Sequence, residues 1–122
     1  MDQRERDEYI RYYFSNLGDG YFTYALENFS KREGFGIEHI YCQFADYYEP
    51  WEEDYFGETG VAFYFDYPAV KEDITLIFDE ETFYMYLIKA SEKYLARYPE
   101  EEQIVKELLA KIKNNLKFPG SK

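Results

Sequence analysis

The chain has 122 residues, the length of one ordinary domain, and we expect a single domain over residues 1–122. Hydrophobic residues make up 46% and aromatic residues 22%, which is enough for a core despite a charged content of 32%. The 25 acidic residues outnumber the 14 basic ones, for a formal net charge of -11. A surface this negative repels phosphate backbones and anionic lipid head groups, so we expect a basic partner and no direct binding to nucleic acid or membrane.

Cysteine content and hydropathy indicate the cytoplasm. Cys42 is the only cysteine, so no internal disulfide can form, and a reducing compartment is the natural interpretation. The first eight residues are densely charged and contain no apolar run of the signal-peptide type. No stretch approaches the roughly 20 apolar residues that a membrane span needs.

Two helical patterns open the chain. The first places apolar residues at the spacing of an amphipathic helix, namely Ile10, Tyr13, Phe14 and Leu17. The run Gly18-Asp19-Gly20 breaks it. The same spacing returns at Phe22, Ala25, Leu26 and Phe29, so we expect a second short helix that ends before Gly34.

The middle of the chain has the period of β-strands. Apolar and polar residues alternate over 38–44, which predicts a half-buried strand. Over 61–67, large hydrophobic residues alternate with Ala62, Tyr64 and Asp66, which predicts a second strand that Pro68 ends. Residues 74–78 read as a third strand. The connection over 67–73 is too short for a helical crossover, so the last two strands should pair antiparallel.

Two more helices are expected at the end of the chain. Asp79 suits the N-cap of the first, whose buried stripe is Phe83, Leu87, Ala90 and Tyr94. Pro99 suits the first position of the second, whose stripe is Ile104 or Val105, Leu108, Ile112 and Leu116. The predicted fold is α+β, a three-stranded antiparallel sheet with two N-terminal and two C-terminal helices in the order α-α-β-β-β-α-α, the helices packed on one face.

The negative charge is concentrated in one segment. Residues 44–81 contain 12 acids and one base, Lys71, so this segment carries a net charge of -11 and the remainder of the chain is balanced. Within it, residues 46–58 join the first two predicted strands and interleave acids with tyrosine, tryptophan and phenylalanine. Acids steer a basic protein toward the surface and pair with its cations, while the rings supply rigid contact area.

We therefore interpret residues 46–58 as a docking surface for a basic protein. The alternative is that its rings fold into the core and its acids only solvate a loop. Two further acids, Glu72 and Asp73, belong to the predicted contact, although they could equally be turn residues. The full set of predicted contact residues is Asp46, Tyr48, Glu49, Trp51, Glu52, Glu53, Asp54, Tyr55, Glu58, Glu72 and Asp73.

The sequence offers little for catalysis, and we expect no enzyme activity, no cofactor and no metal. His39 is the sole histidine and has no obvious nucleophile partner. His39 and Cys42 fall short of the four ligands of a structural zinc site, and Cys42 is better read as a small buried hydrophobic residue. The Gly57–Gly60 run lacks the lysine of a phosphate-binding loop.

Paired carboxylates among aromatic rings are also compatible with a carbohydrate-binding or glycosidase-like domain, which is the alternative function.

Several short runs resemble one protein family. They are Tyr41-Cys42-Gln43-Phe44, Trp51-Glu52-Glu53, Tyr55-Phe56-Gly57, Gly60-Val61-Ala62-Phe63 and Asp79-Glu80-Glu81-Thr82-Phe83. The pattern is similar to the immunity proteins of bacterial contact-dependent growth inhibition systems, in the branch that protects against ribonuclease toxins. The resemblance implies that the partner is a cognate toxin domain, the C-terminal nuclease domain of the inhibition effector. Such a nuclease needs a basic cleft for RNA, and an acidic, aromatic protein would inhibit it by occluding that surface.

Overall fold

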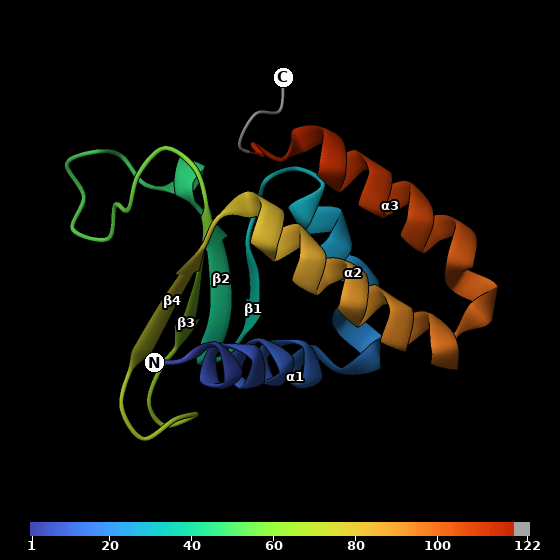
Figure 1. Cartoon of the computed structure of the whole chain (residues 1–122), viewed down its shortest axis with the longest axis horizontal. Helices are drawn as coiled ribbons and strands as arrows, with labels where there is room; N and C mark the ends of the chain where they lie inside the picture. Colours follow the sequence, from blue (N-terminus) through green and yellow to red (C-terminus); the bar gives the residue numbers. More distant parts are fainter. Residues whose placement is uncertain (119–122) are drawn as a thin grey trace.

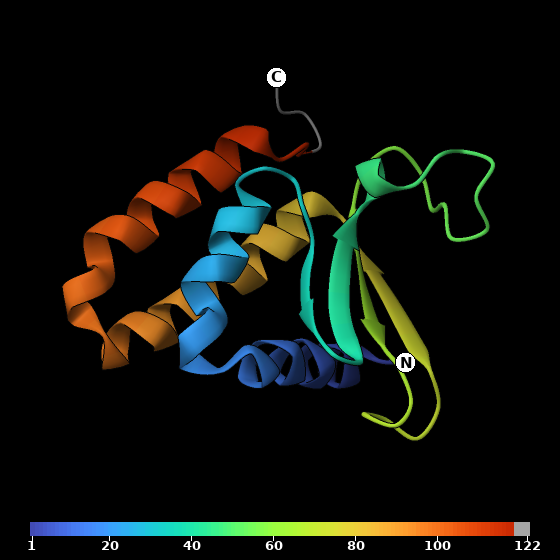
Figure 2. The same ribbon diagram turned by 180° about the vertical axis from the view of Figure 1, so that it is seen from behind.

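The computed structural model describes residues 1–118, which form an antiparallel sheet with its helices on one side (Figure 1; Figure 2 shows the opposite view). The α+β class predicted from the sequence is confirmed. The elements in chain order are α1 (Gln3–Phe29), β1 (Phe35–Ile37), β2 (Ile40–Phe44), the 3-10 helix η1 (Ala45–Tyr47), β3 (Val61–Phe65), β4 (Ile74–Phe78), α2 (Glu80–Arg97), the 3-10 helix η2 (Pro99–Glu101) and α3 (Glu102–Asn115).

The predicted three-stranded sheet is wrong, because the sheet has four strands in the order β1-β2-β3-β4, each antiparallel to the next. The additional strand is β1, which pairs Phe35 with Cys42. The sequence does not indicate strand β1, because Gly34 and Gly36 interrupt the alternation by which a strand is recognised. A Cβ on Gly36 would lie 2.0 Å from the Cβ of Tyr41. The glycines that obscure this strand therefore allow it to lie so close to β2.

The other three strands lie close to where the sequence predicts them. The antiparallel pairing of β3 with β4 is confirmed, with Val61 opposite Phe78 and Phe65 opposite Ile74. Strand β2 begins at Ile40 and not at residue 38, because Glu38 takes a positive φ of 55° in the turn from β1. This difference places His39 in a turn and removes it from the strand.

Helix α1 replaces the two separate N-terminal helices of the prediction. It begins with a capping box, in which the Asp2 side chain accepts from the backbone N–H of Glu5 at 2.9 Å. Its helical dihedrals are interrupted at Gly18, where φ is 63° and ψ is -177°, a region open almost only to glycine. The break predicted at Gly18-Asp19-Gly20 is thus confirmed, as a kink at Gly18 with no intervening loop.

The C-terminal helices follow the predicted signals. Asp79 caps α2, its side chain accepting from the backbone N–H of Thr82 at 2.7 Å. Pro99 begins η2, one 3-10 turn that leads directly into α3. Of the two candidates left open for the stripe of α3, Val105 is buried and Ile104 is exposed. Both helices therefore present the expected faces to the interior.

Aromatic side chains from the helices and the sheet make up the centre of the core. The ring of Phe83 from α2 contacts Phe29 of α1 at 5.3 Å, Phe44 of β2 at 5.7 Å and Phe63 of β3 at 6.0 Å between centroids. Tyr13 of α1 meets Phe63 edge to face at 4.9 Å. Such tilted and edge-on contacts are the favoured geometry of buried rings. They fasten α1 and α2 to the inner face of the sheet.

The outer face of the sheet is also partly covered. All five residues of β3 are buried, whereas burial alternates along β2. The outward-facing Tyr64 lies opposite Tyr41 of β2, and their rings stack at 4.9 Å. Central strands shielded on both faces lose the alternating burial that a one-sided sheet shows.

Within residues 1–118, no helix has both the length and the apolar content needed to cross a membrane.

We predict that the kink in α1 makes two neighbouring glycines respond with opposite signs to the same substitution. Gly18→Ala should lower the free energy of unfolding by about 1–3 kcal/mol, because alanine is strained at this φ and ψ. Gly20→Ala should raise it by about 0.5–1 kcal/mol, because Gly20 is helical and a Cβ there meets no atom within 4 Å. Urea unfolding of both variants measures this difference, and equal effects would mean that α1 is not kinked at Gly18.

Candidate docking surface

The acidic loop, residues 46–58, lies between β2 and β3. It projects beyond the end of the sheet, on the side away from α3 (Figures 1 and 2). Its base is closed by the backbone N–H of Ala45, which donates to the carbonyl of Gly60 at 3.0 Å. Gly60 also donates its N–H to the Glu80 carboxylate at 2.8 Å, which ties the loop to the start of α2. The two ends of the loop are therefore held by hydrogen bonds to the framework.

A single arginine fixes the base of the loop to the helices. Arg32, just after α1, donates from Nη2 to Asp46 at 2.7 Å and from Nε to the same carboxylate at 3.1 Å. It also donates from Nη1 and Nη2 to Glu80 at 2.7 and 2.9 Å, and from Nη1 to the carbonyl of Asn115 at 2.9 Å. We call Arg32, Asp46 and Glu80 the Arg32 cluster. The planar guanidinium suits two bidentate partners at once.

Glu80 is the buried member of the Arg32 cluster, with an exposure of 1%. Burial opposes its ionisation, but the hydrogen bonds from Arg32 and from the N–H groups of Gly60 and Lys117 outweigh this and lower its pKa. The bond from Arg32 likewise lowers the pKa of Asp46, to which Lys117 adds an ion pair at 3.7 Å. Both carboxylates are therefore ionised and already paired with cations of the chain itself.

Asp46 thus differs from the other acids predicted to bind the partner. The carboxylates of the loop that remain are all exposed, and among residues 1–118 none of them forms an ion pair with lysine or arginine: Glu49, Glu52, Glu53, Asp54 and Glu58. Their charge is available to a partner, whereas the charge of Asp46 is used inside the molecule.

A tight turn shapes the tip of the loop and leaves its tryptophan in solvent. The backbone N–H of Glu49 donates to the Glu52 side chain at 2.6 Å, and the N–H of Glu52 donates back to the Glu49 carbonyl at 2.9 Å. Trp51 lies inside this turn with 79% of its surface exposed. An exposed indole flanked by free carboxylates combines apolar contact area with negative charge.

Behind the loop, three tyrosines form a surface that we call the tyrosine face: Tyr41, Tyr48 and Tyr64. The Tyr48 and Tyr64 hydroxyls share a hydrogen bond of 2.8 Å, and Tyr47 stands edge-on to Tyr48 with its own ring exposed. Burial raises the pKa of all three members, so they stay neutral at physiological pH. Tyr64 is buried, so the half-buried Tyr41 and Tyr48 supply the accessible part of this face next to the charged loop. Ring faces of this kind attract lysine and arginine cations.

The remaining predicted contact residues fall into two places. Tyr48 and Tyr55 are half-buried at the loop, beside the exposed acids. Glu72 and Asp73 lie in the connection between β3 and β4, at the opposite end of the sheet, because Phe65 and Ile74 pair at that end while Val61 and Phe78 pair next to the loop. Asp73 accepts from the backbone N–H of Tyr67 at 2.8 Å. The sequence set therefore does not form one continuous patch.

The surroundings of Cys42, one of the residues considered for catalysis, do not favour a reactive thiol. Cys42 is buried, as predicted, and burial raises its pKa to about 11, so its thiol is protonated at neutral pH. Its sulfur lies 3.4 Å from the hydroxyl of Tyr13. Over residues 1–118, no three histidine, cysteine or acidic side chains gather as a metal site would require.

Sequence reasoning missed the tyrosine face and the Arg32 cluster. Tyr41 and Tyr64 both fall at outward positions of strands, and their direct pairing would have predicted an aromatic contact had the register been known. Arg32 leaves no local signal, because its partners lie 14 and 48 residues along the chain. Glu80 reads from the sequence only as a first-turn helix residue.

The comparison with protein families gives one match, over residues 6–109, to a family model described as CDI immunity protein. No curated protein matches the chain. The matched region runs from α1 into α3, so it contains the acidic loop, the tyrosine face and the Arg32 cluster.

We predict that Arg32→Met lowers the free energy of unfolding by about 3–5 kcal/mol, because it leaves Glu80 buried without its cation. Arg97→Met is the matched control, since Arg97 forms a similarly short ion pair with Asp19 but at an exposed site, and its loss should be much smaller. Urea unfolding measures both. Equal losses would mean that burial of the Arg32 cluster does not increase its contribution to the free energy of unfolding.

The same variant should respond to pH. In the folded wild type the pKa of Glu80 is lowered, so its contribution is present above the ordinary value of 4.5 and is lost as the pH falls below it. Without Arg32, burial should raise this pKa, so that protonation then favours the folded state. The gap in unfolding free energy between the wild type and Arg32→Met should therefore narrow as the pH falls from 7 through 4.5. A constant gap would show that the charge of Glu80 is not what Arg32 stabilises.

Proposed function

The chain belongs to the CDI immunity protein family, whose function is immunity toward a toxin, and we propose that it neutralises its cognate toxin by docking the acidic loop and the tyrosine face onto a basic surface of the toxin. In this proposal the protein acts by binding and not by catalysis. Family membership favours this function over the carbohydrate-binding alternative.

The observation that supports the proposal is that some acidic residues are paired with cations inside the fold while others are exposed and unpaired. The Arg32 cluster uses Asp46 and Glu80 internally, while Glu49, Glu52 and Asp54 are exposed and form no ion pair among residues 1–118. Free carboxylates grouped on one loop create a local negative potential that accelerates encounter with a cationic surface. A loop anchored at its base displays these charges without a large ordering cost on binding.

Trp51 supplies the apolar part of the proposed contact. At 79%, Trp51 is the most exposed of the large hydrophobic side chains among residues 1–118. Tryptophan is enriched among the few residues that dominate the energy of protein interfaces. We propose that Trp51 is buried against the toxin while the neighbouring acids pair with its lysine and arginine side chains.

We propose further that the toxin is a ribonuclease and that docking excludes its substrate. An enzyme that binds the RNA backbone needs lysine and arginine side chains in or near its cleft, and these are the natural partners of the acidic loop. We place the encounter in the cytoplasm, in keeping with the free Cys42 thiol. Glu72 and Asp73, at the other end of the sheet, lie outside the primary contact in this proposal.

We predict that reversing three charges of the loop slows toxin association. The triple variant Glu53→Lys, Asp54→Lys, Glu58→Lys, which leaves the Glu52 bond to the Glu49 N–H in place, should lower the association rate constant at least about tenfold at low ionic strength, because the local potential is inverted. These side chains are exposed, so the fold should be retained. Stopped-flow mixing with the toxin domain, and protection of toxin-expressing cells, measure the effect.

The matched control for that experiment reverses three exposed acids on the helical side, Glu92, Glu100 and Glu107, to lysine. Each triple variant changes the net charge from -11 to -5, since each reversal adds two positive charges. The control should slow association much less. If the two variants slowed association equally, only net charge would matter, and the loop would not be the docking surface.

A further inference from the structure

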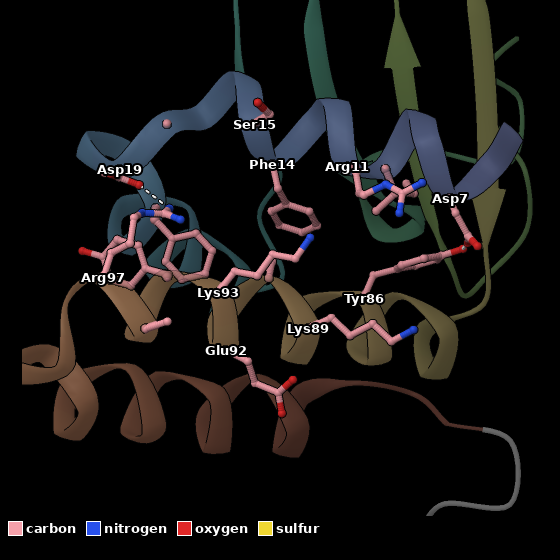
Figure 3. A pocket seen from close by; sticks show the side chains of 16 residues that line it. Asp7, Arg11, Phe14, Ser15, Asp19, Tyr86, Lys89, Glu92, Lys93 and Arg97 are labelled. Atoms are coloured by element: carbon pink, nitrogen blue, oxygen red, sulfur yellow. Dashed lines mark hydrogen bonds and ion pairs between the residues drawn. The ribbon is translucent and has the colours of Figure 1, made fainter. Parts of the chain in front are cut away.

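A groove of about 930 Å³ lies between α1 and α2 (Figure 3), and none of the residues that line it belongs to the acidic loop. Its volume is within the range of pockets that bind small molecules. The kink in α1 contributes to it, because Gly18 lines one end and a Cβ built there would meet no atom within 4 Å. The groove is thus a feature of how α1 bends over α2.

Apolar side chains line the interior of the groove. Ile10, Phe22 and Tyr94 belong to the buried core, and Phe14 is half-buried above them. The rings of Phe22 and Tyr94 stack at 4.5 Å, and the edges of this buried pair lie at the bottom of the groove between the two helices. A ligand that covered it would gain hydrophobic contact that water cannot give.

Polar bridges between α1 and α2 close both ends of the groove. At one end Asp7 accepts a hydrogen bond from Tyr86. At the other end Asp19 pairs with Arg97 at 2.6 Å, as Figure 3 shows. Tyr86 and Arg97 lie 11 positions apart on α2, so the space between the bridges is about 16 Å long. Closed ends of this kind favour a discrete small ligand over an extended chain that would have to pass through.

Three cations at this groove form no ion pair within the described part of the chain. Among residues 1–118, Arg11, Lys89 and Lys93 form no ion pair, and all three line the groove. Figure 3 shows Glu92 pointing away from α1, so it does not neutralise them. Asp7 does lie nearby, where hydrogen bonds from Tyr86 and Gln3, and then the charges of Lys89 and Arg11, lower its pKa. The full lining holds four bases and three acids, so the groove has a net charge of +1 in a protein whose net charge is -11.

We propose that the α1–α2 groove binds a small amphipathic carboxylate, with its anionic head at Arg11, Lys89 and Lys93 and its apolar tail along Phe14, Phe22 and Tyr94. The head lies toward the Asp7 end, where the cations outnumber the single acid. The tail extends toward Gly18, at the end that the Asp19–Arg97 pair closes. Neither half of the site suffices alone, because an exposed ion pair contributes little and a purely apolar ligand leaves the cations without a partner.

Dodecanoate, used below its micelle concentration, is the probe for this site. Titration calorimetry should give one dodecanoate per chain. Dodecanol carries the same tail without the charge and acetate carries the charge without the tail, so each should bind at least about tenfold more weakly. Absence of dodecanoate binding, or equal binding of dodecanol, would overturn the proposal.

Two variants locate the binding in the groove. Lys89→Glu with Lys93→Glu should weaken dodecanoate binding at least about tenfold, because two attractions become repulsions. Lys31→Glu with Lys111→Glu makes the same change in net charge at exposed lysines that do not line the groove and should leave binding unchanged. Equal weakening by both pairs would place the binding outside the groove.

A third variant tests the apolar half. Ala90→Phe places a ring inside the groove from a half-buried position and should abolish dodecanoate binding while Arg11, Lys89 and Lys93 remain. Circular dichroism establishes whether this variant folds. If it does not fold, the Lys89→Glu, Lys93→Glu variant tests whether dodecanoate binds in the groove. None of the changed residues lies in the acidic loop, so toxin association of the lysine variants should match that of the wild type.

Discussion

The structure depends most on the guanidinium of Arg32. It donates to Asp46 at the base of the acidic loop, to Glu80 at the start of α2 and to the carbonyl of Asn115 at the end of α3. Because Glu80 also accepts from Gly60 just before β3, one half-buried cation joins the end of α1, both ends of the loop and both C-terminal helices. The position of the loop is therefore set by charged hydrogen bonds in a largely buried site, where leaving one partner unpaired is costly.

This arrangement gives the acidic residues two different roles. Asp46 and Glu80 are neutralised within the fold, and they hold the loop in place. The carboxylates between Glu49 and Glu58 are held by no cation among residues 1–118, so their mutual repulsion remains and is relieved only when a cationic surface approaches. A protein that keeps such a cluster unpaired loses some stability but gains rapid attraction to a basic partner. Family membership identifies that partner as a toxin, and the unpaired carboxylates support the proposal that the acidic loop is the surface that binds it.

Much of the fold could be predicted from local patterns. The stripes of α1, α2 and α3, the cap at Asp79 and the pairing of β3 with β4 each depend on residues close together in the chain. Strand β1 was missed because its glycines carry no hydrophobic signal, although they allow its close approach to β2. The tyrosine face and the Arg32 cluster were missed for another reason: they join residues that become neighbours only after folding. The charge of the loop was visible in the sequence, but the internal pairing of Asp46 was not.

Trp51 offers the most direct measurement of the central claim, because it is the only tryptophan in the chain and lies at the tip of the acidic loop. With 5-fluorotryptophan incorporated, the free protein should give one fluorine resonance whose frequency depends on whether the solvent is H₂O or D₂O, as expected for an exposed ring. On saturation with the unlabelled toxin domain, the resonance should shift and lose this solvent dependence as the indole becomes buried. An unchanged, solvent-sensitive resonance in the saturated complex would contradict docking through the acidic loop.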